Sequence, residues 1–542
     1  MYECPNCASN LRFNIDRQCM FCEACGTTMS PYDVAKESDA EVREDFEVTI
    51  FTCPQCGAQI VSEDNEAAAF CSFCGGSTIL DARISHEKRP ERILPFKMNK
   101  YDCITAFKKM TKRSIFSPSS VKNYRDVDSF RGIYMPYWMY SVGKNGHVCY
   151  DVRKTLSKYR GDYEYIDHFN YETDLDANYN GVTFDASSSF SDRLSQAIEP
   201  FDTNKLEPFT PAYLSGFYAD TLDVDGDIYD SEVQKLTSEA LYSKLNSDPA
   251  MRGYSTTYDK AKNHIYTSVS KRTLVMLPVW FMSLRHKEKG KEDRVAYVAV
   301  NGQTGEACAD LPISIGKYMI GSLIAALGFF LIFSFLLPVF QNKVPPVIAA
   351  VLAVISGAVY ASQNSRIKKQ ENGEDDAGLM FAKKKGLLKS QPKFDMVTGK
   401  KIKNDDADSK INFLGIKFNP ALVAIVVSIA VVVGLFVINP VSDIPYYAGT
   451  IVSLLMIFML LYKLMKRYNR LTTRKMPQFN RTGGDDSAKT TVRDYERKGA
   501  TQGMINQQGS GNNQGPVNQQ AAYDQGAYTD QSINSNGGGT AQ

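Results

Sequence analysis

Four long apolar stretches dominate the second half of the chain and predict membrane-spanning helices. They cover residues 318–340, 345–361, 421–438 and 446–462, and none of them contains Asp, Glu, Lys or Arg. Each is close to the roughly 20 residues that a helix needs to cross the hydrocarbon core of a bilayer. The alternative, buried core helices of a soluble domain, is disfavoured because four uncharged runs of this length seldom occur together in one. We therefore expect four transmembrane α-helices.

Short links join the apolar stretches in pairs and predict two transmembrane hairpins, over residues 318–362 and 419–463. The links, residues 341–344 and 439–445, hold one basic residue between them, whereas the central loop from Arg366 to Lys417 holds thirteen. Six more follow the last stretch: Lys463, Lys466, Arg467, Arg470, Arg474 and Lys475. By the positive-inside rule, the N-terminus, the basic loop (residues 363–418) and the C-terminus of this multi-pass cell-membrane protein are cytoplasmic.

The uncharged stretches argue against a transporter or a proton pathway, which would place ionisable groups inside the bilayer. The helices are predicted to be an anchor. Within the basic loop, residues 379–389 combine apolar side chains with lysines. Such a segment suits the surface of an anionic lipid bilayer, and a solvated linker is an equally good interpretation.

The pattern of residues 92–317 predicts an α+β cytoplasmic domain. Short strand-like runs are mixed with helical stretches at residues 101–112 and 231–245. Both tryptophans of the chain, Trp138 and Trp280, lie in a recurring phrase with a proline two residues earlier, and each phrase precedes a turn and a second strand. We predict a duplicated β-hairpin with buried tryptophans, which is favoured over a ligand groove because large aromatics on strands are usually core residues.

An acidic segment of this domain partly matches a calcium-binding loop. Asp223, Asp225, Asp227 and Glu232 fit the EF-hand pattern, but its first position is Thr221, where the loop requires an aspartate ligand. An acidic turn leading into a helix is therefore the favoured interpretation.

The last segment, residues 464–542, is predicted to be a disordered tail. After Lys475 it becomes rich in Gly, Gln, Asn and Ser. This composition cannot bury enough apolar surface to fold, and it suits an interaction arm.

The N-terminal region carries a duplicated cysteine pattern. Nine of the twelve cysteines lie at or before Cys74, mostly in Cys-x-x-Cys pairs. Residues 1–30 and residues 50–80 repeat one another at an offset of 49 positions, with an acidic linker (residues 31–49) between them. The recurring cysteines are Cys4, Cys7, Cys22 and Cys25 in the first unit, and Cys53, Cys56, Cys71 and Cys74 in the second.

This spacing predicts two small β zinc ribbons, each holding one structural Zn²⁺ ion with four thiolates. Two residues between cysteines allow a tight turn that aims both sulfurs at one ion, and four thiolates leave no open position for catalysis. Thioredoxin-like chemistry lacks its βαβ context, while an iron site remains the less favoured alternative. Cys19 also forms a Cys-x-x-Cys pair with Cys22, but it aligns with Ala68 in the repeat, so we place it outside the ligand set.

The motifs argue against an enzyme, and the local charge argues against a nucleic-acid-binding protein. The chain holds 62 basic and 60 acidic residues and five histidines, and it contains no G-x-S-x-G, H-E-x-x-H or P-loop phrase, so we expect no enzyme. Residues 1–90 hold fifteen acidic and seven basic residues, and each Zn(Cys)₄ centre adds about −2. Phosphate would be repelled by this region, which argues against nucleic acid and favours protein partners.

Several phrases together resemble one bacterial family. They are the ribbon pair, Ile-Leu-Pro-Phe at 93–96, Gly-Ile-Tyr-Met-Pro-Tyr-Trp at 132–138, Leu-Pro-Val-Trp at 277–280 and Asn-Gly-Gln-Thr-Gly at 301–305. The set is similar to membrane proteins described as TFIIB-type zinc ribbon-containing, sometimes mislabelled as primosomal helicases. The resemblance covers residues 1 to about 340. It implies a membrane-associated role, in some relatives alongside phage-shock-type envelope-stress proteins and flotillin-like scaffolds, and it offers no catalytic residues.

The expected protein is thus multidomain, with two small β zinc ribbons, an α+β soluble domain and four transmembrane α-helices in two hairpins. We expect a membrane-anchored zinc-ribbon adaptor that docks or organises proteins at the cytoplasmic face of the membrane, in envelope-stress assemblies. The alternative is a membrane-tethered nucleic-acid-binding or transcription-related regulator.

Overall fold

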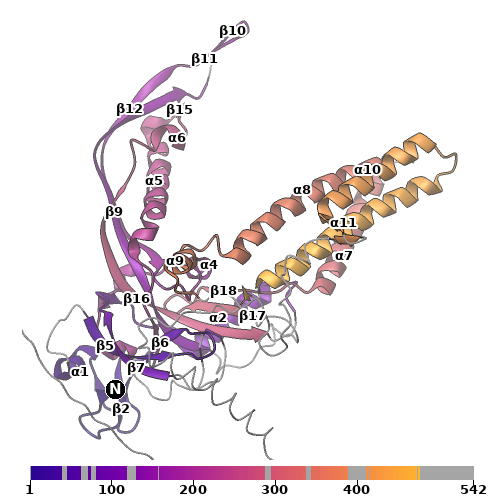
Figure 1. Ribbon diagram of the computed structural model, residues 1–542. Helices are drawn as coiled ribbons and strands as arrows, with labels where there is room; N and C mark the ends of the chain where they lie inside the picture. The colour runs from indigo at the N-terminus through magenta and orange to yellow at the C-terminus, as the bar shows by residue number, and fades with distance from the viewer. Residues whose placement is uncertain are drawn as a thin grey trace, which may run out of the picture. The chain divides into compact units, whose positions relative to one another are not determined.

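The computed structural model describes residues 2–38, 45–62, 71, 73–74, 81–118, 130–156, 158–286, 294–336, 343–388, 411–413, 416–472 and 474–475 (Figure 1). The chain divides into two compact units, Met1–Thr482 and Gly483–Gln542. The tail predicted to be disordered starts at residue 464, but residues 464–472 belong to helix α11 (Ile444–Thr472) and residues 474–475 to strand β21. From residue 476 onward the tail lies outside the described residues.

The first cysteine unit forms a small antiparallel sheet of its own. Its strands are β1 (Tyr2–Glu3), β2 (Asn10–Asn14), β3 (Cys19–Cys22) and β4 (Thr28–Met29), in that order across the sheet. The Cys-x-x-Cys turns lie between β1 and β2 and between β3 and β4. Helix α1 (Pro31–Ser38) follows, so the predicted acidic linker begins with a short helix.

The second cysteine unit is part of the large sheet of the α+β region. Its strands β5 and β6 pair with each other, β5 also pairs with β7, and β6 pairs with β14, which in turn lies beside β9. Thirteen strands of the described residues join this sheet. They are β5 (Asp45–Thr52), β6 (Gln59–Ser62), β7 (Asp81–Lys88), β8 (Arg92–Ile93), β9 (Arg131–Lys154), β12 (His168–Asp185), β13 (Glu207–Pro208), β14 (Tyr218–Asp220), β15 (Tyr254–Ser255), β16 (Ser268–His286), β17 (Arg294–Asn301), β18 (Ala307–Ala309) and β21 (Arg474–Lys475).

The two tryptophan phrases lie on adjacent antiparallel strands, β9 and β16, where Pro136 pairs with Met276 and Pro278 with Tyr134. Both indoles are buried, at 8% and 6% exposure, and donate to backbone carbonyls: Trp138 Nε1 to Val224 and Trp280 Nε1 to Met98. The expectation of buried core tryptophans is confirmed, and a buried donor that is satisfied in this way leaves no reason to invoke a ligand.

Helices cover parts of the sheet. Helix α2 (Lys100–Arg113) starts with a capping box, in which the Asn99 side chain accepts from the Asp102 N–H and the Asp102 carboxylate accepts from the Asn99 N–H. The predicted helix at 231–245 is α5 (Asp230–Asn246). The other helices that the structure describes in this region are α4 (Asp192–Ala197), α6 (Tyr258–Ala261) and the 3₁₀ turns η3 (Thr203–Lys205), η4 (Pro211–Leu214), η5 (Gly226–Tyr229) and η6 (Pro249–Met251).

Strands β9 and β12 continue beyond the sheet as a long two-stranded arm (Figure 1). They pair from Tyr137–Asp185 to Arg153–His168, and α5 and α6 cover one face through a core that includes Tyr150, Leu241 and Ile265. A small hairpin of β10 (Lys158–Arg160) and β11 (Tyr163–Tyr165) forms the tip.

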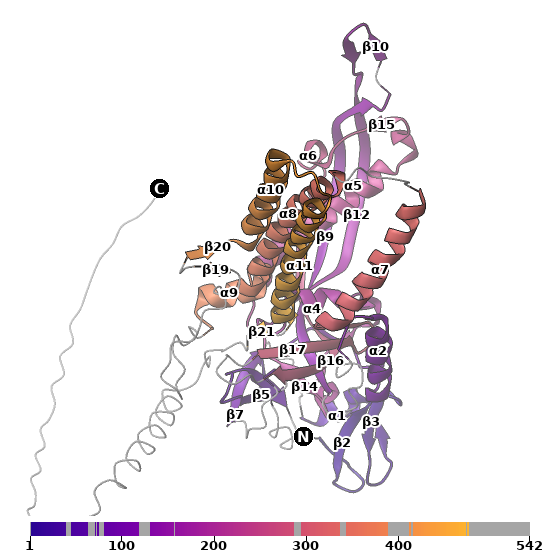
Figure 2. The same ribbon diagram turned by 90° about the vertical axis from the view of Figure 1, so that its right-hand side faces the viewer.

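Within the described residues, three helices are long and apolar enough to cross a membrane, which indicates membrane association. They are α8 (Val344–Asn372), α10 (Pro420–Ile438) and α11 (Ile444–Thr472), which lie side by side in Figure 2. Helix α7 (Ile315–Leu336) covers much of the first predicted span, but its described apolar part is only Ile315–Gly328, so four spans are not confirmed. Small residues allow close packing: a Cβ on Gly357 of α8 would lie 2.8 Å from Ile425 of α10.

Between α8 and α10 the structure describes helix α9 (Ala377–Lys385) and a small hairpin of β19 (Ile411–Phe413) and β20 (Ile416–Phe418). Helix α9 lies in the lysine-rich segment of the basic loop. It is packed against the α+β region, with Ala377 and Phe381 beside a core that contains Trp138 and Tyr229. One face of the helix is therefore docked on the protein, which neither the lipid-surface nor the solvated-linker interpretation anticipated.

Candidate metal centres

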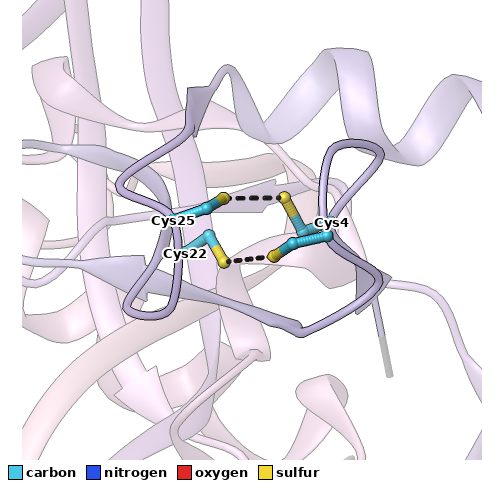
Figure 3. A group of neighbouring side chains, drawn as sticks. Cys4, Cys22 and Cys25 are labelled. Carbon is cyan, nitrogen blue, oxygen red and sulfur yellow. Dashed lines mark hydrogen bonds between the residues drawn. The ribbon is translucent and has the colours of Figure 1, made fainter.

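The first cysteine unit brings its four predicted ligands together. One sulfur from each of Cys4, Cys7, Cys22 and Cys25 lies within 4.8 Å of the others. The Sγ atoms of Cys4 and Cys25 are 3.5 Å apart, as are those of Cys7 and Cys22 (Figure 3). Each pair therefore joins one turn to the other, as in a zinc ribbon.

The second unit does the same with Cys53, Cys56, Cys71 and Cys74. Its cross-turn Sγ distances, Cys53 to Cys74 and Cys56 to Cys71, are both 3.7 Å. A tetrahedral ion with bonds of about 2.3 Å to sulfur requires sulfurs about 3.8 Å apart, whereas a disulfide bond is about 2.05 Å long. Each group of four thiols could thus hold a metal ion.

Protein groups around the sulfurs fit a thiolate shell. Backbone N–H groups of Asn6 and Cys7 are directed at the Cys4 sulfur, and the Thr27 hydroxyl lies 3.0 Å from the Cys25 sulfur. The contact with Thr27 lowers the pKa of the Cys25 thiol to about 6. Such donors favour the ionised form that a metal needs.

The turns require left-handed backbone. Gly26 and Gly57 have φ of 75° and 78°, and Ala8, at the position equivalent to Gly57, has φ of 54°. A Cβ in this region is disfavoured, so the alanine strains the first turn, where the second unit has the unstrained residue.

The two centres differ in exposure. Cys7 and Cys25 of the first centre are exposed, whereas all four cysteines of the second are buried, with at most 1% of each residue accessible. The second centre belongs to a core cluster with Phe73, Phe190 and Phe281, in which the Phe281 ring centroid lies 5.8 Å from those of both other rings. The second centre is thus inside the domain core.

Four buried thiols at this spacing cannot all ionise without a cation. Hydrogen bonds from the neighbouring thiols lower the pKa of Cys53, and the same contacts raise the pKa of Cys56. A divalent ion would relieve this conflict by neutralising half of the charge of four thiolates. The donor set therefore fits Zn²⁺, which would supply structural cross-links and no reactive position.

Cys19 lies apart from both centres. It is the first residue of β3, pairs with Asn14 across the sheet and belongs to neither group of four within the described residues. Its position at the far end of the strand from the Cys-x-x-Cys turn keeps it away from the point where the other sulfurs converge.

A buried network of serines and aspartates is a feature that the sequence patterns did not predict. Ser187 and Ser189 donate their hydroxyls to Asp220 Oδ2, at 2.5 and 2.6 Å, while Asp223 accepts from the Ser188 N–H and hydroxyl. Burial raises the pKa of Asp220 to about 7 and that of Asp223 to about 6. Both carboxylate oxygens of Asp223 accept hydrogen bonds from Ser188. Asp223 is therefore not placed as a ligand of the calcium-binding loop that the sequence partly matches.

A second pair of buried carboxyls, Asp185 and Asp192, lies beside the start of α9. Ser195 donates to Asp185, while Tyr229 Oη and the Ala377 N–H donate to Asp192, at 3.0 and 2.6 Å. Burial, followed by the charge of Asp192, raises the pKa of Asp185 well above its ordinary value. Repulsion between the two adjacent buried carboxylates thus favours the protonated form of Asp185.

The raised pKa of Asp220 gives a test by pH. A carboxyl whose pKa is higher in the folded than in the unfolded state makes the protein less stable as pH rises from about 4 to about 7. We expect the wild type to lose about 1 kcal/mol of unfolding free energy between pH 6 and pH 8, and Asp220→Asn to lose much less. Unfolding in detergent, followed by tryptophan fluorescence, measures this, since both tryptophans lie in the sheet.

The matched control is Asp162→Asn in the exposed β10–β11 turn, which should keep the pH dependence of the wild type. An identical loss in Asp220→Asn would show that another group titrates.

Comparison with known proteins finds a relative in Bacillus subtilis. The chain is 30% identical over 320 residues to the protein "Uncharacterized protein YdjG" of Bacillus subtilis (strain 168), and the match covers 58% of this chain and 91% of that protein. No family model matches the chain. No solved structure matches it either.

Proposed function

The chain belongs to the same protein family as YdjG of Bacillus subtilis, and we propose that it is a membrane-anchored zinc-ribbon adaptor that docks and organises proteins at the cytoplasmic face of the membrane. Two structural Zn²⁺ ions hold the cysteine centres in this proposal. The resemblance to TFIIB-type zinc ribbon membrane proteins extends it to envelope-stress assemblies, with phage-shock-type or flotillin-like scaffold proteins as partners.

The apolar helices and the charge pattern support the anchoring part of the proposal. In the part of the chain that the structure describes, α8, α10 and α11 are long and apolar enough to span a bilayer. The basic loop and the basic residues after the last span favour a cytoplasmic sheet region, where thiols stay reduced and free to bind metal.

The observation that carries the docking part is the tip of the β9–β12 arm. Leu156, Tyr159 and Tyr163 are exposed by 82%, 73% and 74%, and Tyr165 and Ile166 are also exposed. Large apolar and aromatic side chains gathered on a projecting hairpin are costly in water and are typical of protein–protein anchor residues. The arm thus offers a recognition surface at a distance from the metal centres.

The metal centres contribute unequally to docking. The second centre is enclosed by core residues, so protein partners cannot contact its four cysteines. The first centre keeps Cys7 and Cys25 at the surface, and β4 is an end strand of its small sheet. Such an end strand suits docking by strand addition.

One observation favours the alternative function, a nucleic-acid-binding regulator. Arg160 lies directly opposite Tyr163 in the tip hairpin, and Lys158 lies opposite Tyr165, so all four residues share one face. Cations interleaved with aromatic rings also suit single-stranded nucleic acid. Titration of the detergent-purified full chain with single-stranded DNA and RNA separates the two, and micromolar binding that falls steeply with salt would overturn the adaptor proposal.

The full chain is the appropriate sample for that titration. A fragment of residues 1–90 would separate β5, β6 and β7 from their sheet neighbour β14, so it is not expected to fold alone.

The docking proposal predicts that Tyr163→Ser/Tyr165→Ser loses partners without losing stability. Partners captured from crosslinked membranes should fall at least threefold, since truncation of an aromatic anchor commonly costs about 2 kcal/mol of binding free energy. Quantitative mass spectrometry of the captured proteins measures this. Tyr101→Ser, at a tyrosine 75% exposed on α2, is the matched control and should retain them. An unchanged set of captured proteins in the tip variant would refute docking through the arm.

A further inference from the structure

Helix α9 is seated on the α+β region through its N-terminus and its apolar face. The Asp376 side chain accepts from the Leu379 N–H, and Asp192 of α4 accepts from the Ala377 N–H. Gly378 touches η5 so closely that a Cβ there would lie 3.2 Å from Tyr229 Oη. Partly buried hydrogen bonds and a close backbone approach at the same end of the helix define one docked position.

The opposite face of α9 is exposed and basic. Met380 is 44% exposed, and Lys383 and Lys384, three and four residues later, lie on the same side of the helix and are exposed as well. Lys385 Nζ donates a hydrogen bond to Asp225 Oδ2 at 2.5 Å, and the same nitrogen lies 4.4 Å from the centroid of the Phe381 ring. Lys383 donates to the Asn372 carbonyl, and among the described residues no ion pair engages Lys384.

The chain keeps this face close to the bilayer. Helix α8 is apolar up to residue 361 and continues to Asn372, so its last eleven residues extend about 16 Å beyond the hydrocarbon core. Only residues 373–376 separate α8 from α9. The lysines are therefore tethered to the membrane by a short, mostly helical connection in every molecule that inserts α8.

We propose that the outer face of docked α9, formed by Met380, Lys383 and Lys384, binds the anionic headgroups of the adjoining leaflet. Lysine ammonium groups attract phosphate, and the exposed Met380 thioether one turn away suits the boundary between headgroups and acyl chains. An acidic protein could supply the same negative charge. Lipid is favoured because α8, which is linked to α9, is itself inserted in the bilayer, whereas a protein would have to reach this face by diffusion. The helix then joins the α+β region to the membrane surface by its two faces.

This inference rests on the proposed membrane anchoring and not on the proposed docking of protein partners. An experiment can therefore refute lipid binding by α9 without refuting the docking of partners. The test uses the full chain in nanodiscs of phosphatidylcholine alone, or of phosphatidylcholine and phosphatidylglycerol in a two-to-one ratio. Acetylation of Lys383 and Lys384 by an amine-reactive ester, followed by mass spectrometry, should be slowed roughly threefold or more by the anionic lipid. Addition of about 0.5 M NaCl should restore the faster rate, because salt screens headgroup attraction.

Lys108 and Lys109 on the exposed side of α2 are the internal controls, and their acetylation should be the same in both nanodiscs. Equal rates for the α9 lysines in both would overturn the inference. Protection by added poly-glutamate to the same extent as by anionic lipid would overturn it too, because the face would then be a site for acidic polypeptides.

A pair of variants gives a second readout. Phosphatidylglycerol should raise the midpoint of thermal unfolding of the wild type, measured by tryptophan fluorescence, and Lys383→Gln/Lys384→Gln should abolish that rise. Lys108→Gln/Lys109→Gln should leave it intact. If phosphatidylglycerol still raised the unfolding midpoint of the α9 variant, the lipid would act at another part of the protein, and the inference would be overturned.

Discussion

Replacing Cys53 by serine is expected to unfold the α+β region. The variant leaves three thiols in a centre whose four ligands are buried beside Phe73 and Phe281. Zinc bound by four thiolates contributes on the order of 10 kcal/mol in small zinc domains, which is comparable to the whole unfolding free energy of a typical domain. A partly ligated centre also leaves buried thiols and a hydroxyl without partners.

Two measurements check this result. The ratio of bound zinc to purified protein, by elemental analysis, should fall from about two in the wild type to one or fewer. The emission of Trp138 and Trp280, the two tryptophans of the chain, should shift to the red because both indoles become exposed.

Cys7→Ser is the matched variant at an exposed ligand of the first centre. It should also lose one zinc, but only part of the tryptophan emission should shift. Cys4 and Cys22 of that centre belong to the core cluster that contains Trp280, whereas Trp138 lies in another cluster. Cys19→Ala should keep both ions. Native emission in Cys53→Ser would show that the second centre is dispensable to the core, and loss of zinc from Cys19→Ala would reassign a ligand.

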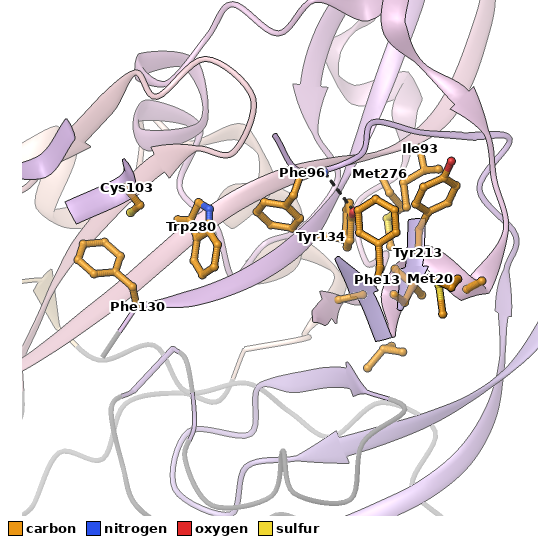
Figure 4. Packing of buried hydrophobic residues seen from close by; sticks show 14 of the residues in the cluster. Phe13, Met20, Ile93, Phe96, Cys103, Phe130, Tyr134, Tyr213, Met276 and Trp280 are labelled. Carbon is orange, nitrogen blue, oxygen red and sulfur yellow. Dashed lines mark hydrogen bonds between the residues drawn. The ribbon is translucent and has the colours of Figure 1, made fainter. Parts of the chain in front are cut away.

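Replacing Phe96 by alanine is expected to destabilise the protein by about 3 to 5 kcal/mol. The ring is fully buried, and its centroid lies 4.9 Å from that of Tyr134, 4.5 Å from Phe217 and 5.3 Å from Trp280 (Figure 4). A Cβ on Gly302 would lie 2.6 Å from the ring, so the surrounding backbone is already in close contact and has little freedom to collapse into the cavity.

Urea unfolding in detergent, monitored by tryptophan emission, measures this loss of free energy. Phe169→Ala is the control: that ring is 43% exposed on the arm, where substitutions usually cost less than about 1 kcal/mol. A similar cost for the two variants would mean that the Phe96 cluster is not the centre of the core. Phe96→Leu should recover part of the loss, because it refills most of the cavity.

Local patterns determined the features that depend on neighbours in sequence. The repeat at an offset of 49 positions identified both groups of four cysteines and placed Cys19 outside them, because a Cys-x-x-Cys turn is a short-range structure. Helices α2 and α5 were predicted to within one residue at each end, since capping and amphipathic spacing are also local. Apolar runs predicted the three candidate spans in the same way.

The pairing of distant strands was beyond these patterns. Residues 50–80 looked like an independent ribbon, yet β6 pairs with β14 from a much later part of the chain, and this pairing puts Cys53 in the domain core. Likewise, Asp192 and Ala377 are 185 positions apart, so nothing local predicted that α9 would dock on a buried carboxyl. The arm was also missed, because the length of β9 and β12 beyond the sheet emerges only from their mutual register.

The sequence by itself therefore determined the cysteine groups, the apolar helices and the acidic N-terminal charge, which follow from spacing and composition alone. Only the tertiary structure decided that all four cysteines of one centre are buried while two of the other remain exposed, and that the lysine-rich helix has one face on the protein. The physical reason is that burial depends on contacts between segments that are far apart in the chain. Two units with the same cysteine spacing can therefore be buried to different extents, because the spacing does not specify which segments pack against them.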